Sequence, residues 1–489
     1  MERPLNLTVH PIDLAIIVVY MVGVVLFGMW IGRGQKDMSS YLLGDRNIPW
    51  WGLMGSIVAT ETSTATFLSV PGIAFIPGGD LRFLQLAFGF IVGRILVSAW
   101  LLPLYFKGEL FSAYEVLQTR FGRETKLAAS LMFLVARNFA DGLRLYLAGV
   151  VLEKVTGFDL GISIVIMGFL TIVYTFFGGM KAIVWTDCIQ FVIYISGGIL
   201  AFFLILRGVP DGWNAFQTFA AEHQKFRFID TTFDIKLPYT VWAGLFGGVL
   251  LTMGTHGTDQ MMVQRYLSAR SRTDAAMALI GSGFIVFLQF ALFLFLGIAL
   301  ATFYSHFPPK TDFARGDEVF ATYIVTYMPA GIVGLILAAV ASAAMSTLSS
   351  SLNSSASAAV NDIYLPARKL SPTSQQAFVA SRVFTVIFGI VQISVGIAAS
   401  FLAGSVINNA LAISGFTAGI MLGMYGLGVL VKSSHQTGAL IGMVLGLAIL
   451  SFVFVYTTVA WPWYSFIGFT STFLFGGIFS LLIPRRNSV

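Results

Sequence analysis

The sequence has few charged residues and one cysteine. Of its 489 residues 11% are charged and 57% are hydrophobic, and the mean hydropathy is +0.83. A surface of that composition is not soluble in water, so the solvent of this chain must be lipid. The single cysteine, Cys188, can form no internal disulfide and suggests no metal cluster.

The chain also lacks room for a separate soluble domain. The longest polar interval, about residues 207–238, is too short for a nucleotide-binding domain, and no Walker-type glycine loop occurs. Energy from ATP is therefore not indicated. No Ser/His/Asp, His-Glu-x-x-His or cysteine constellation supports an enzyme.

What is present is a series of apolar runs of about 20 residues, the length at which a helix crosses about 30 Å of hydrocarbon. We predict an all-α membrane protein with about thirteen spans, forming one transmembrane domain over residues 1–489. The spans are expected near 10–32, 49–76, 81–106, 126–152, 159–178, 182–206, 240–257, 275–305, 329–358, 376–402, 406–431, 437–457 and 462–484.

Basic residues are concentrated in one set of loops between these spans. Lysine and arginine in short loops stay on the cytoplasmic side, which also accounts for the net charge of +6. We expect a multi-pass protein of the plasma membrane, in a bacterium the inner membrane, with its N-terminus outside and its C-terminus cytoplasmic. The residues of this set are Arg33, Lys36, Arg46, Lys107, Arg120, Arg123, Lys126, Lys181, Arg265, Arg270, Arg272, Arg368, Lys369, Lys432, Arg485 and Arg486.

Two spans are poor continuous helices. The second has a hydroxyl-rich centre closed by Pro71 and Gly72, and the seventh ends in Gly254-Thr-His-Gly257. Paired interrupted helices that open two halves of a chain indicate an inverted repeat with a binding site at the midplane. We therefore expect a first repeat at 49–206, a second at 240–431, and peripheral helices at 10–32 and 437–484.

The ninth span carries a polar stripe. Ser346, Ser349, Ser350 and Asn353 recur at i, i+3, i+4 and i+7, which places their oxygens on one face of a helix. Hydroxyl and carbonyl oxygens are the ligands that a hard, partly dehydrated cation requires. The alternative is a small-residue helix that packs closely and uses its serines as interhelical hydrogen-bond donors.

Six charged residues fall at membrane depth, where an unpaired charge costs a few kcal/mol. One alternative is that all six pair to lock the bundle. The other is that the arginines bind a carboxylate, and that the carboxylates beside hydroxyl-rich segments approach one pocket and share a cation or a proton there. The six are Glu61, Arg94, Arg137, Asp141, Arg144 and Asp187.

Four segments resemble the sodium:solute symporter family in the same order along nearly the whole chain. They are Ser112-Ala-Tyr-Glu-Val-Leu117, Trp185-Thr-Asp-Cys-Ile-Gln190, Thr258-Asp-Gln-Met-Met-Val-Gln-Arg265, and Leu348-Ser-Ser-Ser-Leu-Asn-Ser354 followed by Asn361-Asp-Ile-Tyr364. The resemblance implies a LeuT-type fold of two inverted five-helix repeats and sodium as the coupling ion.

The resemblance also implies site residues. A first sodium would be held by the carbonyls of Ala59, Thr62 and Ala343 and the hydroxyls of Ser346 and Thr347. A second sodium or proton site would fall on Asp187, Ser349 and Ser350, with Glu61 beside it. Several family members have an uncharged residue at the position of Glu61, which leaves the ion stoichiometry open. The substrate contacts expected are Ser63, Thr66, Phe67, Gln85, Arg94, Arg137 and Arg144.

The function we expect is sodium-driven import of a small organic solute by alternating access. The substrate stays open between a sugar and a carboxylate or amino acid. A channel or a sensor is the alternative, against which stand the two interrupted helices and the lack of an output domain. The partners expected are sodium, the solute and the bilayer, with no nucleic acid and no obligate protein partner.

Overall fold

Helices account for almost all of the regular structure. The computed structural model describes residues 10–309, 313, 316–401 and 405–483. Within these ranges the β pairing is limited to one isolated bridge between Ile48 and Ala269. The expected all-helical membrane class is confirmed.

The first half of the chain contains ten α-helices and two short turns of other helix types. η1 (Gly44–Arg46) is a 3₁₀ turn and η2 (Val97–Leu101) is a π-helical turn that continues α5 into α6. The α-helices are α1 (Pro11–Ile31), α2 (Met38–Leu43), α3 (Trp50–Glu61), α4 (Thr64–Phe75), α5 (Phe83–Leu96), α6 (Leu102–Tyr105), α7 (Glu115–Phe121), α8 (Arg123–Thr156), α9 (Leu160–Gly208) and α10 (Trp213–Glu222).

The second half begins with the π-helical turn η3 (Ala243–Gly248), which runs directly into α11, and a further π turn, η4 (Ala359–Tyr364), extends α15. The α-helices are α11 (Val249–Gly257), α12 (Gln260–Leu267), α13 (Arg272–His306), α14 (Gly316–Tyr327), α15 (Ile332–Ala358), α16 (Leu365–Arg368), α17 (Gln375–Ser400), α18 (Ser405–Leu430), α19 (Gln436–Tyr456) and α20 (Trp463–Leu482).

Eight helical stretches of the described chain are long and apolar enough to cross a membrane. One of them, α9, contains two of the predicted spans, because its path breaks at Gly179, where φ is +52° and ψ is −160°. Only glycine adopts that backbone geometry at low cost, so the glycine sets the position of the bend.

Four predicted spans are not among these eight helical stretches. For most of the four, the structure gives a physical reason. The span predicted at 49–76 is divided into α3 and α4, and the one at 240–257 is a π turn followed by the short α11. The one at 126–152 lies in α8, which carries three charged residues at mid-span. The one at 406–431 corresponds to α18, of which the part Gly415–Leu430 is a shorter apolar helix.

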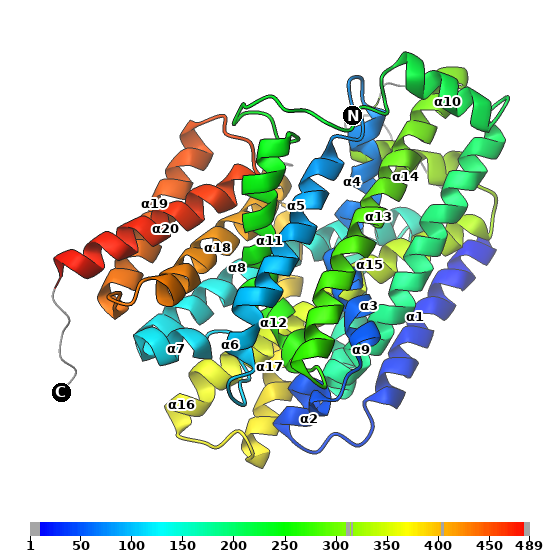
Figure 1. Cartoon of the computed structure of the whole chain (residues 1–489). Helices are drawn as coiled ribbons and strands as arrows, with labels where there is room; N and C mark the ends of the chain where they lie inside the picture. Colours follow the sequence, from blue (N-terminus) through cyan, green and yellow to red (C-terminus); the bar gives the residue numbers. More distant parts are fainter. Residues whose placement is uncertain (1–9, 310–312, 314–315, 402–404, 484–489) are drawn as a thin grey trace.

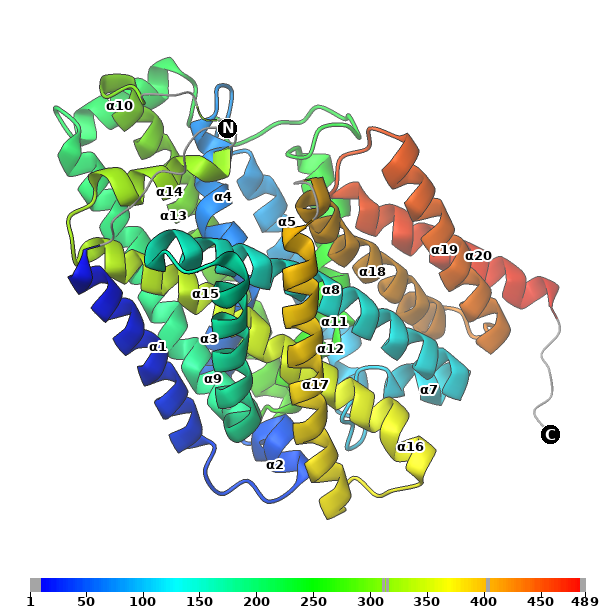
Figure 2. The same ribbon diagram turned by 180° about the vertical axis from the view of Figure 1, so that it is seen from behind.

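The long helices form one bundle, with the first helix and the last two helices at its margins. α1 lies at one edge and the α19–α20 pair at the opposite edge in both views (Figures 1 and 2). The short helices α10 and α14 lie at one end of the bundle, and α2 and α16 at the other. In the interior, where the candidate site is found, α3 and α9 pack against each other and each packs against α13 and α15.

Candidate functional site

The first interruption separates α3 from α4. Thr62 leaves the helix with an extended backbone (φ −82°, ψ 100°), and Ser63 caps α4 by accepting a hydrogen bond from the backbone N–H of Thr66. The last turn of α3 therefore presents carbonyl groups without helical donors. The glycine at 297 allows α13 to lie directly against α4, because a Cβ there would meet the Pro71 carbonyl oxygen at 2.0 Å.

Side chains from two other helices hold this interruption in place. The Thr62 hydroxyl lies 3.0 Å from the Tyr194 hydroxyl and accepts a hydrogen bond from the Gln289 amide at 2.7 Å. Thr62 is buried, as are Gln289 and Tyr194. The non-helical backbone is thus tied to α9 and α13, so it forms a fixed element of the interior.

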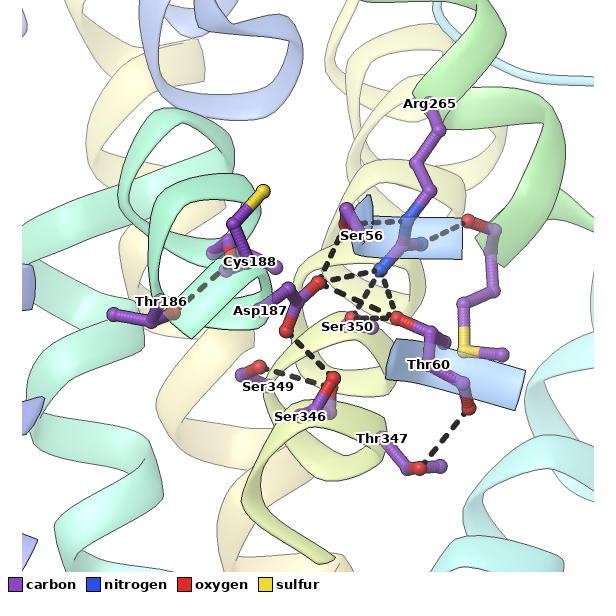
Figure 3. Close-up of polar contacts among 12 residues, drawn as sticks. Ser56, Thr60, Thr186, Asp187, Cys188, Arg265, Ser346, Thr347, Ser349 and Ser350 are labelled. Atoms are coloured by element: carbon purple, nitrogen blue, oxygen red, sulfur yellow. Dashed lines mark hydrogen bonds and ion pairs between the residues drawn. The ribbon is translucent and has the colours of Figure 1, made fainter. Parts of the chain in front are cut away.

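The polar stripe of α15 lies in the protein interior, since every residue from Ser342 to Ala358 is buried. Thr347 of α15 donates to the Thr60 carbonyl of α3 at 3.1 Å (Figure 3). The Thr347 hydroxyl also lies 3.2 Å from the Ala343 carbonyl. The end of α3 and the middle of α15 therefore adjoin. Ala59, Thr62 and Ala343, three further residues predicted for the first sodium, are also buried.

The serines of the stripe divide into two kinds. Ser349 donates back to the Ser346 carbonyl of its own helix at 3.1 Å, as buried helical serines commonly do. Ser346 instead donates to Asp187 of α9 at 2.6 Å, and the Ser350 hydroxyl lies 3.1 Å from that of Thr60 (Figure 3). Of the residues predicted for a second ion, Asp187 and Ser350 lie in one polar network, whereas the Ser349 hydroxyl is engaged within α15.

Arg265 completes that network. Its predicted position was incorrect. The loop-charge pattern assigned it to a cytoplasmic loop, but it lies on α12 with a side chain that is 1% exposed. Its Nε donates to Ser56 at 2.9 Å, and one Nη donates to Asp187 at 3.2 Å and to the hydroxyls of Thr60 and Ser350 (Figure 3). The loop assignment was wrong because α12 is short and polar, and so reads as a connector.

A second buried ion pair lies beside the interruption. Glu61, the last residue of α3, pairs with Arg94 of α5, and the second Nη of Arg94 donates to Ser282 at 2.7 Å. His256 Nε2, near the end of α11, lies 3.5 Å from the same Glu61 oxygen. Glu61 is 20% exposed, whereas Arg94 is fully buried, so the carboxylate is the accessible member of the pair.

The three charged residues in the middle of α8 form a third cluster. Arg144 pairs with Asp141, and Arg137 lies 3.7 Å from Asp141 while pairing also with Asp259, which caps α12. A cavity of about 20 Å³ beside Arg137 and Asp259 has room for about one water molecule. Each of the three arginines predicted to contact substrate therefore has an acidic partner.

The remaining predicted substrate contacts are spread over two places. Phe67 is fully buried between the rings of Phe293 and Phe320, close to Ser63 at the start of α4. Gln85 instead joins α5 to the segment after α10, because its amide donates to the Tyr239 carbonyl at 3.2 Å and accepts from the Asp230 N–H at 3.0 Å.

Charged residues strengthen the connection between α5 and the segment after α10. Arg82 pairs with Asp80 at 2.7 Å and with Asp230 at 2.9 Å. Hydrogen bonds from Thr232, together with that from Arg82, lower the pKa of Asp230 to about 2. Lys225 donates to the carbonyls of the last turn of α4, at 2.8 Å for both Ala74 and Ile76. The C-terminal end of α4 is thus covered by a charged segment.

The chain is similar to known transporters over most of its length. The profile of the sodium:solute symporter family matches residues 41–446. The sodium/sialic acid symporter SiaT of Proteus mirabilis (strain HI4320) is 30% identical over 444 residues, which span 89% of this chain and 88% of that protein. The sodium/iodide cotransporter of Homo sapiens is 29% identical over 433 residues, which span 86% of this chain but 66% of that longer protein.

Solved structures agree with the sequence comparison. The substrate-bound outward-open state of a Na⁺-coupled sialic acid symporter has a TM-score of 0.89 at 28% identity, covering 97% of this chain and 98% of that one. MhsT in complex with L-phenylalanine has a TM-score of 0.52 at 15% identity, covering 92% and 99% of the two chains. The second likeness concerns the fold alone.

Proposed function

We propose that sodium binds between α3 and α15 of this chain, which belongs to the sodium:solute symporter family. The chain is a sodium-coupled solute symporter with a LeuT-type fold. The ligands of the sodium ion are the carbonyls of Ala59, Thr62 and Ala343 and the hydroxyls of Ser346 and Thr347. The single observation that carries this site is the position of the Thr347 hydroxyl between a carbonyl of α3 and one of α15. An all-oxygen ligand set of this kind suits a hard monovalent cation.

We propose a second cation site at Asp187 and Ser350, with Ser349 contributing after its hydroxyl leaves the Ser346 carbonyl. Asp187 already has a cationic partner in Arg265, at 3.2 Å. A sodium ion at this place therefore competes with a guanidinium for the same carboxylate. That competition supports a second ion that binds more weakly than the first.

Glu61 is the other carboxylate proposed for ion or proton binding. Its partner is Arg94, whereas that of Asp187 is Arg265, so the two carboxylates belong to separate ion pairs. We propose that ion or proton binding at one carboxylate affects binding at the other only indirectly, through the residues that lie between the two ion pairs.

Coupling of Glu61 to sodium can be tested by measuring transport against sodium at several pH values. We expect Glu61→Gln to remove any pH dependence of the apparent sodium affinity if a proton and sodium compete near Glu61, and Asp187→Asn to change the sodium affinity at every pH. A wild-type protein whose sodium affinity does not change with pH would assign Glu61 to a structural ion pair.

We propose that the solute is a small organic anion, bound where α4 begins. The N-terminus of a half-helix carries partial positive charge and attracts anionic groups. The corresponding end of α12 is already capped by the Asp259 carboxylate, which accepts from the Met261 N–H at 2.8 Å, whereas α4 is capped by the neutral Ser63. Relatives named for sialic acid, iodide and monocarboxylates support the same choice.

A neutral sugar is the second candidate, because Arg94, Arg137 and Arg144 all have acidic partners. Thr66 and Phe67 then contact a sugar ring in place of a carboxylate. In both cases sodium binding favours the outward-open state and completes the substrate site, after which the two repeats, 49–206 and 240–431, move relative to each other.

The substrate class can be settled by competition in proteoliposomes. We expect carboxylates to inhibit sodium-dependent uptake and to stabilise the protein thermally only when sodium is present. A panel in which sugars compete and no carboxylate does would overturn the anionic assignment. Matched experiments with choline in place of sodium control for binding that is not coupled to the ion.

We propose that the N-terminus is outside and the C-terminus cytoplasmic, in the inner membrane if the source is a bacterium. The end of the bundle that carries α2 and α16 also carries Arg33, Lys36, Arg46, Arg368 and Lys369, which supports a cytoplasmic position for that end.

A reporter fused after Val489 should therefore be active in the cytoplasm, and one placed before Pro4 should be active outside. An even number of spans would put both reporters on the same side and contradict the count of thirteen. Reporters inserted in the segments before α2 and after α10 serve as internal references, because they should report opposite sides.

A further inference from the structure

A cavity lies at the end of the bundle that carries α2, away from the ion and substrate sites. It has a volume of about 380 Å³ and is bordered by the last turns of α1, the bend of α9 and α17. Volumes of this size accommodate small organic ligands. The end of α1 lies directly against the bend of α9. This close approach requires glycine at position 32, because a Cβ there would meet the Phe177 carbonyl oxygen at 2.2 Å.

The wall of this cavity is basic and has no acidic member. Arg33 follows α1, Arg382 comes from α17, and both guanidinium groups lack an acidic partner within the described part of the chain. Arg382 instead stands over aromatic rings, at 4.5 Å from the ring centre of Phe378 and 5.4 Å from that of Phe176. The arrangement leaves two permanent positive charges beside one cavity.

Two polar atoms of lining residues have no hydrogen-bond partner among the described residues. They are the Nε of Arg382 and the amide oxygen of Gln35, whose amide nitrogen is bound to the Gly178 carbonyl at the bend. Buried polar atoms without partners are uncommon and carry a cost in free energy. A small rotation of Arg382 toward an anionic ligand, which accepts hydrogen bonds, removes that cost for its Nε, whereas the Gln35 oxygen requires a donor such as a headgroup hydroxyl.

The opposite side of the cavity is apolar and faces the surroundings of the bundle. Leu26 is 57% exposed and Trp30 is 61% exposed, and Met29 lies between them on the same helix. A tryptophan at the end of an apolar span is typical of the membrane interface. The cavity therefore joins a basic recess at headgroup depth to an apolar helix face that contacts lipid tails.

We propose that this cavity binds one anionic phospholipid. The phosphate lies between Arg33 and Arg382, and one acyl chain follows the outer face of α1 along Leu26 and Trp30. Basic recesses between helices at the cytoplasmic end of a membrane protein are suited to such headgroups. The bound lipid links α1 to α17 across the bend of α9, at a place where the residues that the structure describes form no ion pair.

The test is lipid binding by the full-length protein purified in mild detergent. Phosphatidylglycerol, phosphatidylcholine with the same acyl chains, and inorganic phosphate are added separately. Retained lipid is counted by native mass spectrometry and thermal unfolding is followed in parallel. We expect one phosphatidylglycerol to be retained and to raise the unfolding temperature, whereas phosphatidylcholine and phosphate do neither.

Arg33→Gln should weaken retention about fivefold, which corresponds to about 1 kcal/mol for one basic residue near a headgroup. Arg382→Gln should do the same, and the exposed Arg33 variant keeps the test valid if loss of the Arg382 stacking impairs folding. Arg368→Gln, which removes an exposed arginine of α16 outside the cavity, is the matched control and should leave retention unchanged.

Three results would overturn the proposal. Equal retention of phosphatidylcholine would show a general lipid contact without headgroup recognition. Stabilisation by inorganic phosphate alone, to the same extent as by phosphatidylglycerol, would assign the cavity to a free anion. Equal losses in Arg33→Gln and Arg368→Gln would show that overall charge, and not this cavity, attracts the lipid.

Discussion

Replacing Ser346 or Thr347 with alanine should raise the sodium concentration needed for half-maximal transport about tenfold or more. Each hydroxyl is a proposed ligand of a cation that otherwise contacts only carbonyl groups, and a hydrogen bond or contact to a charged group is worth about 1.5 to 3 kcal/mol. The Thr347 variant also loses the 3.1 Å contact to the Thr60 carbonyl, which joins α15 to α3. Sodium activation of uptake, measured at fixed solute concentration, reports the change.

Ser354→Ala is the matched control for these two variants. Ser354 is buried on the same helix, and its hydroxyl donates to the Ser351 carbonyl at 3.1 Å. It should keep wild-type sodium activation, so a general effect of removing a serine from α15 would be detected. Unchanged sodium activation in both Ser346→Ala and Thr347→Ala would exclude the proposed first site.

Breaking the Arg265–Asp187 pair should cost about 3 to 5 kcal/mol of stability in either single variant, Arg265→Gln or Asp187→Asn. Both partners are buried, at 1% and 0% exposure, so each substitution leaves one charge in the interior without its counter-charge. The double variant removes both charges and should be more stable than the sum of the single losses predicts. Thermal unfolding of the four proteins gives the interaction free energy directly.

Stabilisation by sodium is a second, more specific test of the Arg265–Asp187 pair. In Arg265→Gln the carboxylate of Asp187 loses its guanidinium, and a sodium ion can take that place with Ser350 and Ser346 as further ligands. We expect sodium, but not choline, to stabilise Arg265→Gln more than it stabilises the wild type. Glu61→Gln is the matched comparison and should show no such gain. Additive losses without sodium-specific recovery would mean that Arg265 is a structural partner only.

Much of the architecture could be predicted because it depends on local properties of the sequence. Apolar runs located the spans, the hydroxyl-rich centre of the second span and the glycines at 254 and 257 indicated where helices are interrupted, and the serine spacing identified the face of α15 that contacts α3. Pro71 did not mark the first interruption, because it lies inside α4 and the chain leaves the helix at Thr62. These signals lie within one helix, where periodicity and backbone preferences act. The helical class and the family were therefore accessible without coordinates, and the comparisons confirm both.

The partners of the buried charges could not be predicted in this way. Arg94 pairs with Glu61 across 33 positions and Arg265 with Asp187 across 78, and nothing in the spacing of either pair indicates the contact. Arg265 was assigned to a loop because the polar residues of α12 interrupt the apolar pattern. Gln85, which was predicted to contact the substrate, binds backbone groups of the segment after α10, and this tertiary contact could not be predicted from its place at the start of α5.

The most direct test of the proposed ion site is equilibrium binding of radioactive sodium to the purified protein. The wild type and Ser354→Ala should bind sodium saturably and with equal affinity in an excess of choline, and Ser346→Ala and Thr347→Ala should each bind at least about tenfold more weakly. Wild-type affinity in both of the latter variants would contradict the central claim that sodium binds between the end of α3 and the serine stripe of α15.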